Sequence, residues 1–345
     1  MSNIKWIAAG IPDINNPNKF YASTNGINWT GLSNINNTTI WEETKSMKSK
    51  IDGTTRIVAV GNGYIKGDNT KRRPCIYSDD NGQSWVSPSY VWENNEFHDF
   101  MINNTIFNSI DSSGRRFVAV GKKSTGNGSS AVLMKSPSGE YWVHEYIPYI
   151  SNGDHDFELY DVKWTGDTGG WIAVGKIKHN NNAYYIYHSS DKEATNWSPL
   201  SWSYGNTYIP KVITTYGTKY YLSNRNLNKI FASGDNWNTT VWTLINTNLS
   251  GKIYALINTG SNRVIVGGQD VTTSIKYTND GTTFIDGANI NFYYPLTVKC
   301  LALKNNTILA GSDDGRLFIS TNTGQSWTIV YTNTNIAFNS IEYVP

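Results

Sequence analysis

A short apolar run that ends in glycine recurs along the chain, with alternating apolar and polar residues around it. The runs are WIAAG, IVAVG, FVAVG, WIAVG, VIVGG and ILAG. Their last glycines are Gly10, Gly61, Gly121, Gly175, Gly267 and Gly311. The successive spacings are 51, 60, 54, 92 and 44 residues, and the long gap contains one degenerate copy, KYYLSN from Lys219. The pattern therefore predicts seven copies of one strand-rich unit.

Each copy of the pattern contains further apolar segments. A strand follows the glycine run and ends in a polar turn and an aromatic residue, as in CIYSDDNGQSW from Cys75 and LFISTNTGQSW from Leu317. A short apolar strand precedes the run, as in FNSI from Phe107 and VKCLAL from Val298. The alternation and the β-branched residues favour strands of about 4–6 residues, divided by Gly, Asn and Asp turns. Four such strands per copy are typical of a β-propeller, whose blades are four-stranded antiparallel sheets.

The two ends of the chain indicate how the blades close into a ring. The first copy starts directly at KWIAAG, with no room for a preceding strand, whereas FNSIEYV from Phe338 is a strand with nothing after it. We therefore expect the C-terminal strand to complete the first blade, which removes a free sheet edge. The prediction is an all-β, seven-bladed β-propeller that forms a single domain over residues 1–345. Its blades are approximately residues 1–38 with 335–345, then 39–95, 96–148, 149–203, 204–248, 249–292 and 293–334.

The composition agrees with strands and turns and disfavours several classes of protein. Only 16% of the residues are charged and 13% are aromatic, while Asn, Thr, Ser and Gly are abundant. Asn, Ser and Gly compete with helical hydrogen bonding. The formal net charge of +2 gives no reason to expect nucleic acid or a membrane surface as partner. Two cysteines, Cys75 and Cys300, make no disulfide framework.

The sequence shows no targeting segment. The apolar run in MSNIKWIAAG is too short for a signal peptide. No segment approaches the roughly 18 apolar residues of a membrane span. We therefore expect no export signal and no membrane span, and a protein that is cytoplasmic at synthesis.

A polar turn between the third and fourth predicted strands is repeated with similar residues. A short Asp or Asn side chain can accept hydrogen bonds from the turn amides, glycine takes a positive φ, and the tryptophan buries its ring. We therefore interpret this turn as a folding device and not as a catalytic site. Its residues are Ser78, Asp80, Gly82, Ser84 and Trp85 in the second copy, and Ser320, Asn322, Gly324, Ser326 and Trp327 in the seventh.

This turn resembles the Asp-box of BNR repeats, whose pattern is S-x-D-x-G-x-[ST]-W. The second copy matches in full, and the seventh has Asn in place of Asp. Such blades occur in sialidases, photosystem II assembly factor-like proteins, sortilin-like receptors and bacterial lectins. Repeat proteins of phages and giant viruses with the form FVAVG…YSTDGxxW look especially similar. The resemblance implies a virion-associated or host-binding protein that is not an enzyme.

A sialidase-like glycosidase is the alternative, enzymatic interpretation. That resemblance would imply an arginine triad, a Tyr–Glu nucleophile pair, an Asp acid and an Arg-Ile-Pro-like motif near the first blade. None of the arginines lies in such a motif. No pair of histidines has a metal-ligand spacing, and no nucleophile elbow or phosphate loop is present. We therefore expect no catalytic residue, no metal and no cofactor.

Antiparallel strand order places two sets of loops at one end of the blades. The B–C loops join the second strand to the third, and the D–A loops join the fourth strand to the next blade. The B–C loops of copies two to four follow directly after the glycine runs, as NGYIKGDNTKRRP, KKSTGNGSS and KIKHNNNA, and together carry a charge of +7. Their basic residues are Lys66, Lys71, Arg72, Arg73, Lys122, Lys123, Lys176, Lys178 and His179.

The D–A loops of the same region are rich in aromatic residues, among them Trp92, Tyr149, Trp202 and Tyr204. Aromatic rings beside cations suit sugars that bear acid groups, or a protein partner with an acidic rim. Single-stranded nucleic acid would need a longer basic track. We therefore hypothesise that this end binds a glycan or protein partner of acidic character. The alternatives are ordinary solvated surface, and a purely structural subunit of a virion or an assembly factor.

Overall fold

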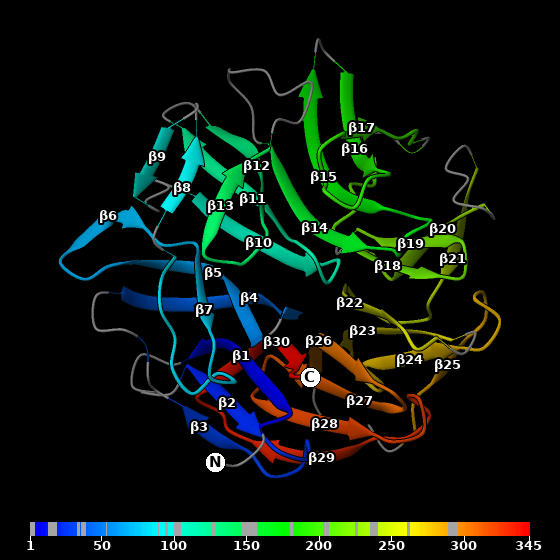
Figure 1. The fold of residues 1–345 in the computed structure, drawn as a ribbon. Coiled ribbons are helices and arrows are strands. Elements are labelled where there is room, and N and C mark those ends of the chain that lie inside the picture. Colours follow the sequence, from blue (N-terminus) through cyan, green and yellow to red (C-terminus); the bar gives the residue numbers. More distant parts are fainter. Residues whose placement is uncertain are drawn as a thin grey trace. The chain divides into compact units, whose positions relative to one another are not determined.

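Strands make up every named element of the computed structural model (Figure 1). The structure describes residues 4–12, 19–32, 35, 39–52, 54–88, 90–93, 96–99, 105–125, 128–145, 157–179, 182–202, 204, 207–224, 227–234, 241–260, 263–288 and 296–345. The all-β prediction is confirmed, and within these ranges no helix is long and apolar enough to cross a membrane. The chain divides into two compact units. Unit 1 is Met1–Leu32 with Pro210–Tyr343, and unit 2 is Ser33–Ile209 with Val344–Pro345.

Unit 1 contains antiparallel sheets in which most paired strands follow one another in the chain. The first has the order β3-β2-β1-β30, with β1 (Trp6–Pro12), β2 (Phe20–Ser23), β3 (Thr30–Leu32) and β30 (Ile336–Tyr343). The second is β18 (Val212–Tyr216), β19 (Lys219–Ser223), β20 (Lys229–Ser233) and β21 (Trp242–Asn246). Two further sets are joined through β23 and β26. They are β22 (Ile253–Asn258), β23 (Val264–Asp270), β24 (Ile275–Thr278) and β25 (Phe284–Asp286), then β26 (Leu296–Lys304), β27 (Thr307–Ser312), β28 (Arg316–Ser320) and β29 (Thr328–Thr332).

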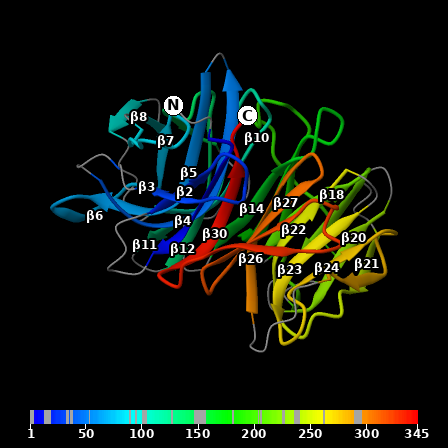
Figure 2. The same cartoon turned by 90° about the horizontal axis from the view of Figure 1, so that it is seen from below.

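Unit 2 contains three sheets among its described residues, and their strand pairs are antiparallel except for one parallel pair in the second sheet. The first holds β4 (Thr39–Asp52), β5 (Thr54–Ile65), β6 (Asp68–Arg72) and β7 (Cys75–Ser78), and its long β4 and β5 lie side by side in Figure 2. The second holds β10 (Thr105–Ser112), β11 (Phe117–Thr125), β12 (Gly128–Ser136) and β13 (Tyr141–His144), extended by β8 (Tyr90–Glu93) and β9 (Glu96–Asp99). The third is β14 (Glu158–Trp164), β15 (Trp171–His179), β16 (Asn182–Ser189) and β17 (Ser198–Pro199).

The C-terminal strand completes the first sheet, as the sequence predicts. β30 pairs antiparallel with β1 from Trp6↔Tyr343 to Pro12↔Ile336. The first and last strands of the chain therefore share one sheet. The closed ring of seven blades, the blade boundaries and the single domain stay predictions.

The repeated glycine marks a β-bulge and not the start of a loop. β11 continues past Gly121 to Thr125, and opposite this glycine β10 carries one extra residue, Asn108. The bulge brings a carbonyl close to the glycine, since a Cβ on Gly121 would lie 2.0 Å from Ile106 O. The same close approach occurs at Gly10, Gly61 and Gly175. The prediction that loops follow these glycines is therefore wrong for β5, β11 and β15, because the bulge lets the strand run on.

The second strand of each repeat, such as β11, is buried on both faces. Along β11, Phe117 and Ala119 pack into one apolar cluster with Val58 and Val60 of β5. Between them, Val118 packs into another cluster with residues of the β14–β17 sheet. Burial on both faces explains why these strands read as continuous apolar runs and not as a strict alternation.

The repeated polar turn is held by its own side chains. Ser78 Oγ accepts from Gly82 N at 2.8 Å, and Asp80 Oδ1 accepts from Ser84 N at 2.8 Å. Trp85 Nε1 donates to Gly82 O at 3.0 Å, and its ring is 1% exposed. The turn from Ser320 to Trp327 repeats these hydrogen bonds with the Asn322 side chain in the place of the carboxylate. These contacts support the interpretation of the turn as a folding device.

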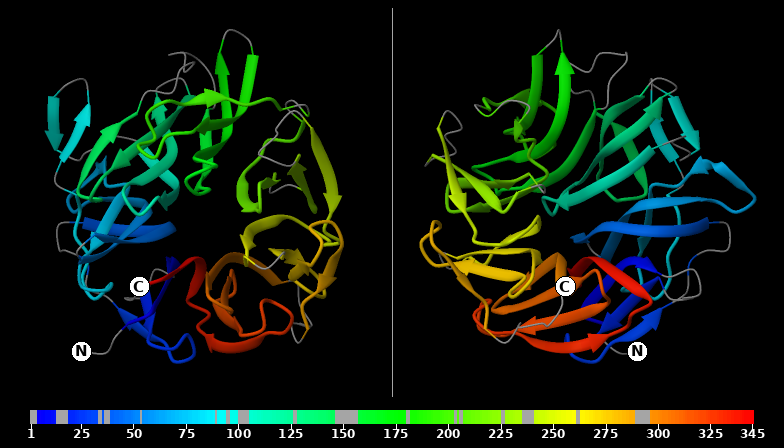
Figure 3. Two further views of the ribbon diagram at one scale, coloured as in Figure 1. Left: turned by 45° about the vertical axis from the view of Figure 1, so that its right-hand side comes forward. Right: turned by 180° about the vertical axis from the view of Figure 1, so that it is seen from behind.

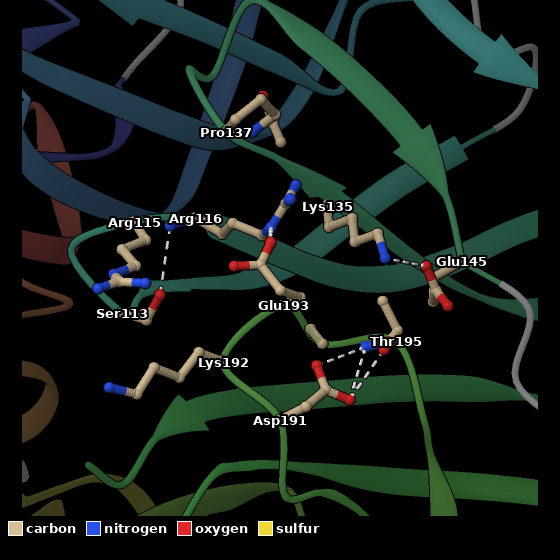
Figure 4. Close-up of polar contacts among 12 residues, drawn as sticks. Ser113, Arg115, Arg116, Lys135, Pro137, Glu145, Asp191, Lys192, Glu193 and Thr195 are labelled. Atoms are coloured by element: carbon tan, nitrogen blue, oxygen red, sulfur yellow. Dashed lines mark hydrogen bonds and ion pairs between the residues drawn. The ribbon is translucent and has the colours of Figure 1, made fainter. Parts of the chain in front are cut away.

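Hydrogen bonds to the turn carboxylates lower their pKa. Burial alone would raise the pKa of Asp191, but donors from Thr195, Asn196 and Ser189 outweigh it and lower the pKa from 3.8 to about 2. Figure 4 shows the Asp191 carboxylate accepting from Thr195. A carboxyl group with a depressed folded pKa stabilises the fold fully above its unfolded pKa, and this stabilisation is lost as the pH falls through the folded pKa.

We predict that Asp191→Asn flattens the acid dependence of stability. Asn322 shows that an amide can hold the same turn, so the variant should fold at pH 7. Between pH 4 and pH 2 the wild-type protein should lose about 1 kcal/mol more stability than the variant, a value reduced for solvent screening. Urea unfolding at pH 7, 4 and 2.5 measures the difference. Identical pH profiles for the two proteins would contradict the role of this carboxylate.

Arginines near the start of the second strands reach the turn of the following sheet. Arg56 lies over the Tyr77 ring at 4.3 Å and donates to Ser138 O at 2.9 Å. Arg263 lies over Tyr277 at 4.8 Å and donates to Thr323 O at 3.0 Å. Arg116 instead forms an ion pair with the Glu193 side chain (Figure 4). These arginines therefore tie neighbouring sheets together, a role that the sequence analysis did not assign to them.

The connection from β7 to β10 forms a hairpin on the next sheet. β8 and β9 pair antiparallel, and β8 pairs in parallel with β13 at Val91↔Trp142 (Figure 3). This sheet therefore has six strands and not the four predicted for a blade. Shorter parallel bridges, Ile35↔Trp85 and Ala288↔Ser326, occur at equivalent connections. The connections between sheets thus dock beside the turn tryptophans.

Candidate binding surface

The strand register places the predicted basic residues at one end of the unit 2 sheets. Lys123 of β11 pairs with Thr105, the first residue of β10, and Lys176 of β15 pairs with Glu158, the first residue of β14. The hairpin from the second to the third strand and the entry to the first strand therefore lie together, which we call the B–C end of unit 2. β10 lies beside both β4 and β14, so the three sheets are neighbours.

Two of the predicted residues are neutralised by acidic neighbours. Arg72 lies 3.6 Å from Glu42 and donates to Asn62 Oδ1 at 3.0 Å. Lys122 lies 3.5 Å from Glu158 of the next sheet. These two cations are therefore already engaged.

Three lysines keep their charge available at this end. Lys66 is exposed in the turn between β5 and β6, whereas Lys123 and Lys176 are half-buried. Across the described part of the chain, no side-chain hydrogen bond or ion pair involves any of the three. They come from three neighbouring sheets.

Other predicted residues are placed only in part. The structure places the backbone of Lys71 on β6 and the backbones of Lys178 and His179 on β15. It places the backbone of Trp92 on β8, opposite Val143. Tyr149 lies outside the described residues. Trp92 is thus on a strand between β13 and β9 and not in the loop that the sequence analysis assigned to it.

Trp202 and Tyr204 form a small aromatic cluster with Tyr208. The Trp202 and Tyr204 rings lie 5.4 Å apart, and the Tyr204 and Tyr208 rings lie 5.7 Å apart. Trp202 Nε1 donates to Tyr208 O at 3.0 Å, which ties these two residues together. All three rings are half-buried.

The sequence analysis missed a row of side chains that the bulges bring together. Lys45, the extra residue of β4, donates to Asn108 Oδ1 at 3.0 Å. Asn108, the extra residue of β10, donates to Glu158 Oε1 and to Leu159 O, each at 2.8 Å. The only sequence signal for this row is the glycine that faces each bulge. The row links the first strands of all three sheets of unit 2.

A buried carboxylate supports the same strands. Asp111 is 5% exposed, accepts from Trp164 N at 2.8 Å and lies 3.4 Å from Lys48. Burial alone would raise the pKa of Asp111, but the charges of Lys48 and Lys163 outweigh it, and the pKa is lowered. Asp111 is therefore an ionised link between sheets and not a proton donor at neutral pH.

The summed charge of the predicted loops overstates the charge of this end. The connections that share it carry Glu93, Glu96, Asp99, Asp154 and Asp156 in the sequence. Among the described residues, no group of three or more His, Cys, Asp or Glu side chains is placed to hold a metal ion. Binding of an anionic partner at this end would therefore depend on individual cations and not on a net electrostatic field.

Comparison with known proteins shows the fold. No protein-family model matches the sequence, and no curated protein matches it. A protein from Lactobacillus plantarum has a similar structure, with a TM-score of 0.64 at 11% identity over 99% of this chain and 100% of the other. A structure of YCF48 bound to D1 peptide is similar with a TM-score of 0.52 at 16% identity, over 92% of this chain and 86% of the other. The third, a Bacteroides uniformis ATCC 8492 protein with a proposed 6-phosphogluconolactonase activity, has a TM-score of 0.61 at 8% identity over the full length of both chains. At these identities the likeness shows the fold alone, which is a β-propeller.

Proposed function

We propose that this chain is a binding propeller without enzymatic activity, and that its partner is a protein with an exposed acidic segment. The observation that carries the proposal is the placement of Lys66, Lys123 and Lys176 on three neighbouring sheets of unit 2, with no acidic partner among the described residues. YCF48, which has a similar fold, was solved with a bound peptide. A peptide ligand is therefore compatible with this architecture.

The chemistry of the B–C end suits an extended acidic segment. Lysine ammonium groups attract carboxylates electrostatically, and dissolved salt weakens this attraction. Lys123 and Lys176 lie on paired strands and Lys66 lies in the turn between two paired strands, so their backbone positions are held at set spacings. Several weak contacts of this kind add up when one peptide spans them all.

The arginines give no support to the sialidase-like alternative. Arg56, Arg116 and Arg263 are engaged with turns of neighbouring sheets, and Arg72 is engaged with Glu42. A sialate-binding triad needs arginines that converge on one carboxylate. We therefore prefer the binding function.

Neutralising the three lysines should remove binding of an acidic peptide. We expect Lys66→Gln, Lys123→Gln and Lys176→Gln together to weaken binding of fluorescein-labelled hexaglutamate by roughly tenfold or more, since each exposed pair contributes up to about 1 kcal/mol. Fluorescence anisotropy at low and high salt measures the affinity. The matched control replaces Lys229, Lys252 and Lys304 of unit 1 by Gln, which removes the same charge elsewhere.

Equal losses in the test and control variants would contradict the proposal, because the effect would then reflect net charge alone. Binding of a sulfated glycan in preference to the peptide would favour the glycan partner instead. An absence of hexaglutamate binding to the wild-type protein would count against the function as stated.

The finer expectations from the sequence remain part of this proposal. The turn from Ser78 to Trp85, with its internal hydrogen bonds, supports assignment to the Asp-box repeat proteins. Association with a virion, carbohydrate binding and cytoplasmic location at synthesis are predictions that need separate tests.

A further inference from the structure

Glu158 brings a negative charge to the B–C end, among the lysines that the proposed function uses. It is the first residue of β14, and its side chain is 20% exposed. Lys176 of β15 stands directly opposite it in register, so the two side chains lie on the same face of the β14–β17 sheet. The Glu158 carboxylate therefore shares one face with a cation that the proposed function assigns to the partner.

Two groups of the neighbouring sheet hold this carboxylate in place. Glu158 Oε1 accepts from Asn108 Nδ2 at 2.8 Å, and Glu158 Oε2 lies 3.5 Å from Lys122 Nζ. Asn108 also donates to Leu159 O at 2.8 Å, and its own Oδ1 accepts from Lys45 at 3.0 Å. Because a different group contacts each carboxylate oxygen, the negative charge of Glu158 has a set position between the β10–β13 and β14–β17 sheets.

The ion pair of Glu158 and Lys122 is open to solvent. The Lys122 side chain is 34% exposed, so this cation is within reach of a dissolved anion. Ion pairs at the surface are weak and are readily perturbed by another charge nearby. The carboxylate of Glu158 and the carboxylates of an acidic partner therefore compete for the same ammonium group.

We propose that Glu158 limits the affinity of the B–C end for its acidic partner. Its carboxylate neutralises Lys122 and repels a partner carboxylate that approaches Lys176. Only a segment with several acidic residues, in contact with Lys66, Lys123 and Lys176 together, then gains enough to bind. The proposal rests on the proposed function and makes it more specific, since it names the residue that selects against weakly acidic partners.

Removing the charge of Glu158 should strengthen binding. Glu158→Gln keeps an oxygen that accepts from Asn108 but leaves Lys122 without its carboxylate. Hexaglutamate should bind this variant about fivefold more tightly than the wild-type protein, as expected for one exposed charge pair. The matched control is Glu140→Gln, which removes the same charge from the turn after β12, at the far end of that strand, where Glu140 lies 3.6 Å from Arg56. The control should leave the affinity nearly unchanged.

Lys122 supplies a second variant, whose effect has the opposite sign. Lys122→Met leaves the charge of Glu158 without its cation and should weaken hexaglutamate binding about fivefold. With both substitutions in one chain the affinity should return close to the wild-type value, because the pair is then neutral again. A purely structural role would not make the two single variants change the affinity in opposite directions. Equal affinities of Glu158→Gln and Glu140→Gln, or an unchanged affinity in Lys122→Met, would overturn the assignment.

Inorganic sulfate separates failure of this inference from failure of the proposed function. Sulfate should raise the melting temperature of Glu158→Gln more than that of Glu140→Gln. If hexaglutamate binds all the variants with equal affinity, the role of Glu158 is wrong and the function stands. If sulfate distinguishes the two Gln variants but no acidic peptide binds, the role of Glu158 in limiting anion binding stands and the protein partner is wrong. If neither probe distinguishes these two variants, the role of Glu158 is overturned.

Discussion

Deleting residues 336–345 should leave a chain that does not fold. These residues include β30, which pairs with β1 through seven residue pairs and supplies the fourth strand of its sheet. Ile336, Phe338 and Ile341 are each no more than 5% exposed, and the Phe338 ring lies 5.5 Å from the Tyr21 ring. Without β30, one edge of β1 and the apolar cluster beneath it would be open to water.

The expected loss is comparable to the whole stability of an ordinary domain. Burying each of the three apolar side chains contributes about 2 kcal/mol, so their removal costs roughly 6 kcal/mol before any hydrogen bond is counted. Domains are stable by only about 5–15 kcal/mol. Circular dichroism and solubility of the truncated chain measure the effect, and a peptide of residues 334–345 added in trans should restore folding. A truncated chain that melts within a few degrees of the full chain would show that β30 is dispensable.

Gly121→Ala should be among the most damaging single-methyl substitutions in the described part of unit 2. The added Cβ would lie 2.0 Å from Ile106 O and 2.7 Å from the Phe107 Cα, and both are backbone atoms that no side-chain rotation can move. Overpacking of this kind costs about 3 kcal/mol or more when the backbone must shift. Chemical denaturation of the variant measures the loss.

Gly217→Ala is the matched control for this experiment. Gly217 has a φ of 56°, and a Cβ there would meet nothing within 4 Å. The Gly217→Ala variant should therefore lose only the stability that a left-handed backbone costs a residue with a Cβ, about 1–2 kcal/mol. Equal losses at the two positions would contradict the bulge explanation of the repeated glycine.

The features that could be predicted from the sequence are those set by local pattern. The apolar runs before Gly121 and Gly175 indicate buried strands, and the turn from Ser78 to Trp85 contains all the groups that it uses. The role of β30 also follows from the sequence, because the first copy has no strand to precede β1. Each of these inferences depends only on one segment of the sequence and on the spacing of apolar and polar residues within it.

The features that could not be predicted depend on partners far away in the sequence. Asn108 and Glu158 are 50 residues apart, and their hydrogen bond requires two bulges to be in register. Lys122 and Lys123 are adjacent in the sequence but face different sheets, so one meets Glu158 and the other meets Thr105. A charge count cannot distinguish these two lysines.

Amide hydrogen exchange of the full chain with and without hexaglutamate would locate the binding surface. Protection is expected only at the B–C end of unit 2, at 61–75, 105–110 and 121–132, with little change in unit 1. Protection that falls in unit 1, or an exchange pattern that the peptide leaves unchanged at saturating concentration, would contradict the proposed binding surface.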